Sequence, residues 1–147
     1  MKIAFSHVSL VSRDWRALAD FYIDVFGCTE KLPERNLKGL WVDRLTGLKN
    51  AHIQGIHLTL PGSDGPTLEI FQYRENRENS TKEINREGFA HIAFAVEHVP
   101  VCVDRLLVHG GSLVGEVIDT DIEGVGHISV VYARDTEGNI IELQKWS

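Results

Sequence analysis

The sequence predicts an α+β fold made of two β-α-β-β-β modules that follow one another along the chain. Two observations indicate this fold. An internal repeat appears when the sequence is shifted by 84 residues, and turn residues separate short apolar runs at matching places in both halves. With 147 residues, the chain has the length of one ordinary domain, so we expect the two modules to share that domain.

The first strand of each module is expected to carry a histidine at its centre. The runs Phe5–Val11 and Phe89–Ala95 align under the shift, and both alternate about a histidine, His7 in the first and His91 in the second. Apolar residues at helical spacing follow each run, and they predict helices over Asp14–Val25 and Val99–His109. Asp14 is the expected N-cap of the first helix. Glycine ends both helices, at 27 and at 110–111.

Each module is expected to end in a hairpin, because two apolar runs flank a cluster of turn residues. The predicted hairpin strands are Ile56–Leu60 with Thr67–Phe71, and His127–Tyr132 with Ile140–Leu143. Before each hairpin there is room for one more strand, near Leu40–Leu45 and near Leu113–Ile118. The modules are therefore predicted to cover about residues 1–73 and 88–147. Between them, the almost entirely polar stretch 74–87 is predicted to be a solvated linker.

The composition excludes several classes of function. The net charge is −6, and the acidic excess lies in residues 88–147, so no basic stripe could follow a nucleic acid. The apolar runs are too short to span a membrane, and no secretory leader is recognisable, so we expect a soluble cytoplasmic protein. The two cysteines, Cys28 and Cys102, form no metal or redox motif and are predicted to be free, buried thiols.

Four ionisable residues recur at matching positions of the repeat. His7 and His91 lie in the first strands, and Glu69 and Glu142 lie in the last strands. Ionisable side chains in apolar strands are costly unless they are paired or bind a metal, although each one alone could simply face solvent. Two imidazoles and two carboxylates suit a six-coordinate divalent metal such as Ni, Co, Mn, Fe or Zn. Such a site leaves two positions for water or for two oxygens of a substrate.

This arrangement resembles the vicinal oxygen chelate superfamily, which includes glyoxalase I, bleomycin resistance proteins and extradiol dioxygenases. The helix end Phe21–Gly27 is similar to the family's FYxxxLG pattern, and Arg134–Leu143 is similar to its DPDGNxIEL hairpin. The resemblance implies two sheets that form a cup around one metal, with His7, Glu69, His91 and Glu142 as its ligands. It also implies a small-molecule substrate. Because single modules leave sheet edges exposed, we expect a homodimer.

The activity that the resemblance implies is a metal-dependent lyase or isomerase reaction. A proton is taken from a carbon next to a carbonyl, a metal-chelated enediolate or enolate is stabilised, and Glu69 or Glu142 serves as the base. Val11 and Ile70–Tyr73 differ from the pattern by which glyoxalase I contacts glutathione, so no substrate is named. Two alternatives stay open: a metal-dependent dioxygenase or thiol transferase, and a drug-sequestering protein without catalysis.

Two further features of the sequence are an acidic run and a second pair of histidines. The run Asp119–Gly124 imitates the start of an EF-hand, but Val130 stands where a bidentate Glu is required, so we expect an acidic loop or a flap over the site. His57 and His127 are interpreted as equivalent residues at the start of their strands, on the surface or as donors behind the metal ligands.

Overall fold

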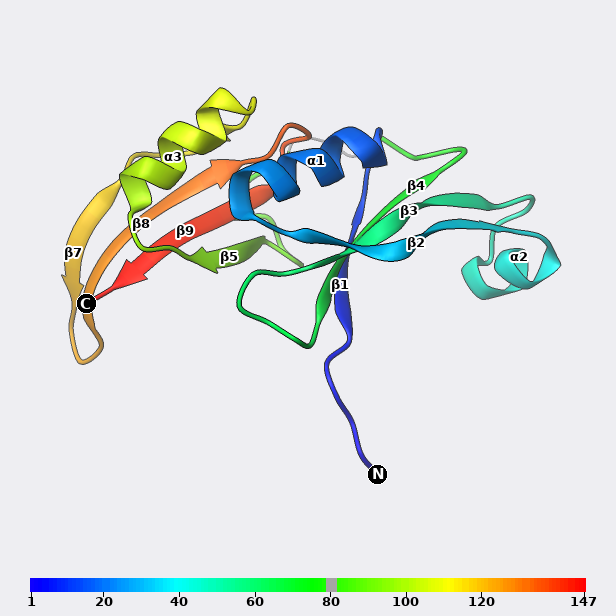
Figure 1. Cartoon of the computed structure of the whole chain (residues 1–147), viewed down its shortest axis with the longest axis horizontal. Helices are drawn as coiled ribbons and strands as arrows, with labels where there is room; N and C mark the ends of the chain where they lie inside the picture. The colour runs from blue at the N-terminus through cyan, green and yellow to red at the C-terminus, as the bar shows by residue number, and fades with distance from the viewer. Residues whose placement is uncertain (79–81) are drawn as a thin grey trace. The chain divides into compact units, whose positions relative to one another are not determined.

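The computed structural model describes residues 1–78 and 82–147, and the chain divides into two compact units, Met1–Glu78 and Asn79–Ser147. Within the described residues, one unit contains a four-stranded mixed sheet and the other a five-stranded mixed sheet, with three helices in all. The predicted α+β class is confirmed (Figure 1). Of the linker predicted over 74–87, residues 79–81 lie outside the described residues, and the division into modules stays a prediction.

The first unit has six elements. In chain order they are β1 (His7–Val11), α1 (Trp15–Phe26), β2 (Thr29–Lys38), α2 (Leu40–Thr46), β3 (His52–Thr59) and β4 (Thr67–Tyr73). The strand order is β1-β4-β3-β2. Strand β1 runs parallel to β4, whereas β3 is antiparallel to both of its neighbours. The two ends of the unit's chain therefore pair side by side.

Helix α1 begins and ends as its sequence predicts. The Asp14 side chain accepts a hydrogen bond from the backbone N–H of Ala17, at 3.2 Å, which satisfies a donor at the helix start. Gly27 adopts the left-handed conformation, with φ 72°, and its N–H bonds the Ile23 carbonyl. The buried face of the helix consists of Trp15, Leu18, Ala19, Phe21, Tyr22 and Val25.

The strand predicted near Leu40–Leu45 is wrong, because this segment forms helix α2 and the additional strand is β2. Gly39, with φ 105°, turns the chain between the two elements. The Asp43 carboxylate then accepts hydrogen bonds from the N–H groups of Asn50 and Ala51, which anchors the helix to the start of β3. Apolar residues suggested a strand here, but Leu40 and Leu45 are largely exposed.

The second unit repeats this plan with a different middle section. Its elements are β5 (His91–Ala95), α3 (Val99–Val108), β6 (Ser112–Leu113), β7 (Ile118–Ile122), β8 (Gly126–Arg134) and β9 (Ile140–Trp146). The strand order is β5-β9-β8-β6, and β7 also pairs with β8. The predicted strand near Leu113–Ile118 is therefore divided between β6 and β7. The loop expected at Asp119–Gly124 is wrong over most of its length, because β7 pairs antiparallel with β8.

The turn between β8 and β9 is organised by one buried carboxylate. Asp135 is 4% exposed and accepts hydrogen bonds from the N–H of Glu137 and from both the N–H and the side-chain amide of Asn139, at 2.7–2.9 Å. Gly138 follows with φ 80°. This turn lies where the sequence predicts it, and it sets the register that carries Glu142 into β9.

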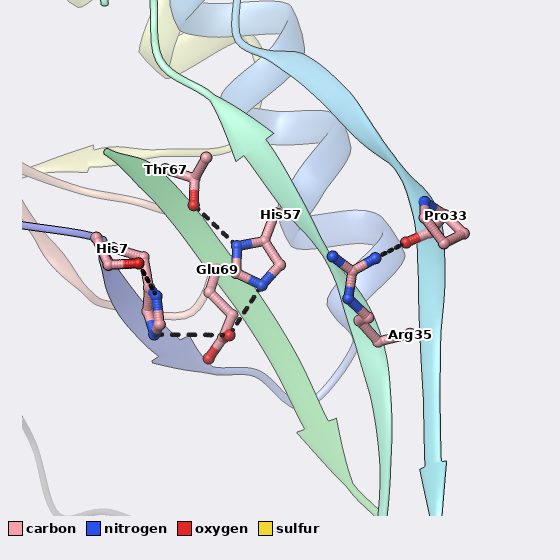
Figure 2. Close-up of polar contacts among 7 residues, drawn as sticks. His7, Pro33, Arg35, His57, Thr67 and Glu69 are labelled. Carbon is pink, nitrogen blue, oxygen red and sulfur yellow. Dashed lines mark hydrogen bonds and ion pairs between the residues drawn. The ribbon is translucent and has the colours of Figure 1, made fainter. Parts of the chain in front are cut away.

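Alternation along the strands separates a core face from an open face in each sheet. Leu68 and Ile70 of β4 are fully buried, as are Ile141 and Leu143 of β9. Successive side chains of a strand point to opposite faces, so Glu69 and Glu142, which lie between these pairs, occupy the other face of their sheets. Helix α1 lies behind the sheet of the first unit in Figure 2, on the side away from Glu69.

Both cysteines are free thiols, as predicted. Cys28 is 1% exposed, whereas Cys102 is only partly buried. Burial raises the pKa of Cys28 to about 11 and also raises the pKa of Cys102 above its usual value. No helix among the described residues has the length and hydropathy needed to cross a membrane.

Candidate metal-binding and catalytic site

The four predicted site residues form two His–Glu pairs, one in each unit. In both units the pair joins the first strand to the last, and these strands are parallel neighbours. The register partner of Glu69 is Ser9, two residues after His7, and that of Glu142 is Ala93, two residues after His91. Side chains two residues apart share a face of a strand, so both units bring an imidazole and a carboxylate together on the same diagonal.

In the first unit, Glu69 lies between two imidazoles (Figure 2). Its Oε2 atom is 3.7 Å from Nε2 of His7 and 3.0 Å from Nε2 of His57. The two rings meet edge to face, with centroids 5.4 Å apart. The Nδ1 atom of His7 lies 3.2 Å from the Ser6 hydroxyl. If Nδ1–H donates to that hydroxyl, the Nε2 lone pair of His7 is left free for a cation.

His57 also belongs to this site, and the prediction that it starts its strand is wrong. It does not start its strand but lies well inside β3, directly opposite Glu69 in the antiparallel register. Its Nδ1 atom is 2.8 Å from the hydroxyl of Thr67, which is 6% exposed. Burial lowers the pKa of His57, although the Glu69 carboxylate opposes this effect. The signal in the sequence was the strand register, because a hairpin whose loop is Leu60–Pro66 pairs position 57 with 69.

The pair of the second unit is closer and has different neighbours. Nε2 of His91 lies 2.9 Å from Oε2 of Glu142, whose side chain is 15% exposed. Tyr132 is the residue opposite Glu142 in register, so it takes the place that His57 has in the first unit. Its ring packs on His91 with centroids 5.2 Å apart.

His127, which the sequence suggested as the counterpart of His57, lies elsewhere. It stands at the second position of β8, and its Nδ1 contacts Asp121 at 2.9 Å. Both of these side chains are well exposed, at 46% and 88%. His127 therefore forms a surface pair with Asp121, and the equivalence with His57 is wrong.

The donor atoms of the two pairs are of the types that bind divalent transition metals. Each pair offers one imidazole nitrogen and one carboxylate oxygen on a half-buried sheet face, and these donors suit Zn, Ni, Co, Mn and Fe. In residues 1–78 and 82–147, no cluster of three or more His, Cys, Asp or Glu side chains is arranged to hold a metal ion. Each unit thus brings two of the four predicted ligands together.

Comparison with known proteins identifies the family of the chain. The model of the Glyoxalase/Bleomycin resistance protein/Dioxygenase superfamily matches residues 4–143, which is nearly the whole chain. The chain belongs to this superfamily. The superfamily contains many enzymes as well as resistance proteins without catalysis, and its members commonly bind divalent metals and act on small molecules. The resemblance predicted from the sequence is therefore confirmed.

Solved structures that share this fold have low sequence identity to this chain. A glyoxalase family protein from Bacillus cereus is 24% identical, with a TM-score of 0.77 over 99% of this chain and 94% of that chain. The fosfomycin resistance protein FosX from Listeria monocytogenes is 18% identical, with a TM-score of 0.64 over 100% and 96%. A domain of the superfamily from Frankia is 20% identical, with a TM-score of 0.64 over the full length of both chains. A search of the curated proteins gives no match.

Proposed function

We propose that this protein is a divalent-metal-dependent lyase or isomerase of the glyoxalase type, which removes a proton from a carbon next to a carbonyl. The observation that carries the proposal is the recurrence of the same His–Glu diagonal in both units. A single such pair is common on a sheet face. Two copies, each at the junction of the first and last strands, support a shared role as ligands.

The proposed ligands are His7, Glu69, His91 and Glu142, and the cation is one of Ni, Co, Mn, Fe or Zn. When bound, the cation would supply positive charge to two vicinal oxygens of a small-molecule substrate and stabilise the anion left by proton removal. The two histidines would hold the cation through neutral nitrogens. The two carboxylates provide both charge balance and a base, and a carboxylate within reach of the substrate carbon can accept its proton.

The fold supports these roles of the histidines and the glutamates. Each glutamate lies between two fully buried residues of its strand, so its backbone is fixed while its carboxylate reaches the open face. The Glu69 and Glu142 side chains are 13% and 15% exposed, which shields them from bulk water but leaves them accessible to a ligand. We also propose a cytoplasmic homodimer, in keeping with the dimers that family members often form.

The metal content of the purified protein tests the proposal directly. Plasma mass spectrometry before and after reconstitution with Ni, Co, Mn, Fe and Zn should find about one equivalent of a transition metal per chain. The variants His7→Ala/Glu69→Ala and His91→Ala/Glu142→Ala should each lose it. The matched control is His127→Asn, which removes the exposed histidine of β8 that pairs with Asp121 on the surface. Metal retained in both double variants would refute the ligand set.

Mixing the two double variants shows whether the ligands come from one chain or from two. If each site joins the first unit of one chain to the second unit of another, a mixed dimer contains one site with all four ligands. Half of the wild-type metal content would then return in the mixed dimers. If each chain supplies a complete set, mixing restores nothing. Absence of metal from the wild-type protein under every condition would instead favour the drug-sequestering alternative.

One observation favours a second candidate function, a metal-dependent thiol transferase or dioxygenase. Glu69 lies closer to His57 than to His7, at 3.0 Å against 3.7 Å. A Glu69 held by His57 would leave two histidines and one carboxylate as ligands, the set associated with such chemistry. Oxygen uptake with Fe(II), or thiol addition to an epoxide, that survives Glu69→Gln would identify it.

A further inference from the structure

We propose that His57 is a positioning residue for Glu69, fixed by the hydroxyl of Thr67. The three side chains form a continuous chain of contacts: Thr67 Oγ1 to His57 Nδ1 at 2.8 Å, and His57 Nε2 to Glu69 Oε2 at 3.0 Å. Thr67 is almost fully buried, and the side chains of His57 and Glu69 are 16% and 13% exposed. Water therefore has little access to these contacts, and each polar atom depends on its protein partner.

The chemistry of the end groups fixes the direction of the hydrogen bonds. A carboxylate only accepts, so His57 must donate to Glu69 through Nε2–H. In the neutral ring, Nδ1 is then an acceptor, and the Thr67 hydroxyl donates to it. The contact with Glu69 thus fixes the tautomer of His57, and the Thr67 hydroxyl satisfies the Nδ1 acceptor of that tautomer. His7 is able to adopt the opposite tautomer, because the Ser6 hydroxyl beside its Nδ1 can accept a hydrogen bond and Nε2 is then a lone pair.

The second unit lacks this device at the matching positions. The residue opposite Glu142 is Tyr132, and the residue opposite His91 is Ile140, whereas the corresponding residues of the first unit are His57 and Thr67. Tyrosine and isoleucine cannot reproduce the relay from hydroxyl to imidazole to carboxylate. Glu142 has His91 as its only ion-pair partner in the described residues. Under the proposed function, a cation on Nε2 of His91 removes that partner, but a cation on His7 leaves His57 in contact with Glu69.

The two carboxylates are therefore unequal. Both imidazole contacts of Glu69 go to Oε2, and no partner of Oε1 is found in the described part of the chain. His57 holds one oxygen, and the other is presented to the open face. Insofar as this inference concerns ligand binding, it rests on the proposed function. The relay itself does not depend on a metal.

Nitrogen NMR of the imidazoles in the metal-free protein tests the relay. The expected spectrum shows His57 as the neutral Nε2–H tautomer, and Thr67→Val, which keeps the shape of the side chain, should shift the Nδ1 resonance. A signal of the Nδ1–H tautomer, or a Thr67→Val spectrum identical to wild type, would overturn the proposal. The Tyr132→Phe variant is the matched control in the second unit and should leave the His57 resonances unchanged.

Metal affinity by chelator competition tests the consequence for Glu69. His57→Phe, which keeps a ring but no donor, should weaken binding about tenfold. His57→Gln should recover part of this loss because its amide can donate, and His127→Asn, which alters a surface pair with Asp121, should stay close to wild type. Thermal unfolding confirms that each variant folds. Equal affinity of His57→Phe and wild type would refute the positioning role. If wild type binds no metal, the proposed function fails, and the NMR result alone decides the relay.

Discussion

Nε2 of His91 lies 2.9 Å from Oε2 of Glu142, although the two residues are not register partners. The register partner of Glu142 is Ala93, two residues after His91. His7 and Glu69 have the same offset in the first unit. A parallel pair of strands slants its hydrogen bonds, and side chains two residues apart share one face. The offset therefore places the imidazole and the carboxylate of a pair on the open face, with the core residues of the same strands on the other.

Glu142→Gln should weaken metal affinity by at least about tenfold, because the amide keeps the shape of the side chain but loses the negative charge. Lyase or isomerase activity should disappear with it. Isothermal titration with the native metal measures the affinity. Glu116→Gln removes an exposed carboxylate of the same unit and should change nothing. Wild-type affinity in Glu142→Gln would contradict the assignment of this ligand.

Gly55→Ala should destabilise the protein by about 2 kcal/mol. A Cβ atom at this position would collide with the backbone carbonyl of Ile70 and come within 2.9 Å of the Phe71 Cα, and neither backbone atom can move without opening the β3–β4 pair. Urea denaturation measures the change. Gly65→Ala is the control, since its nearest contact would be an ordinary one with the Ser63 hydroxyl at 3.9 Å. Equal midpoints for both variants would show that the strands separate more easily than the structure implies.

Asp135→Ala should cost about 2 kcal/mol, because it removes the acceptor of three hydrogen bonds in the turn before β9. The loss should also appear as faster hydrogen exchange of the Glu137 and Asn139 amides. Asp119→Ala, on the exposed strand β7, serves as the control and should leave stability within about 0.5 kcal/mol. A similar small effect for Asp135→Ala would mean that the turn forms without its carboxylate.

Stability should fall as the pH rises from about 9 to about 11, and Cys28 should be one cause. Burial raises its pKa from 9.0 to about 11, so the folded state keeps the thiol protonated over this range while the unfolded chain releases the proton. The stabilisation is complete below pH 9 and is lost as the pH passes through the folded-state pKa. Thermal melting from pH 8 to 11 should show a flatter profile for Cys28→Ala than for wild type. Identical slopes would exclude the contribution of this thiol.

Much of the fold follows from local patterns in the sequence. The N-cap at Asp14, the glycine at 27 and the turn at Asp135 each act through contacts within a few residues, and all three lie where the sequence predicts them. The segment Leu40–Thr46 was mistaken for a strand because its apolar residues indicate burial, whereas Leu40, Trp41 and Leu45 are exposed and only Val42 is buried. The decisive feature was Gly39, whose conformation starts a new element.

The sequence predicts only those residues of the candidate site that occupy matching positions in the repeat. The four proposed ligands occupy matching positions of the repeat, with the histidines 84 residues apart and the glutamates 73 residues apart. The structure pairs His7 with Glu69 and His91 with Glu142. The repeat also suggested His57 as a donor behind the ligands, but it matched His57 with His127, whereas the residue at the corresponding position of the second unit is Tyr132. The role of His57 depends on the register of one hairpin, and a one-residue error in register moves a side chain to the opposite face.

The relay in the first unit makes the two halves of the chain non-interchangeable. A protein assembled from two copies of the second unit would keep both imidazole–carboxylate pairs, yet Tyr132 and Ile140 would stand where His57 and Thr67 are now. Substitutions at matching positions of the repeat should accordingly have unequal costs. The shared strand pattern would then reflect duplication of one module. The different residues opposite the two glutamates would reflect later divergence.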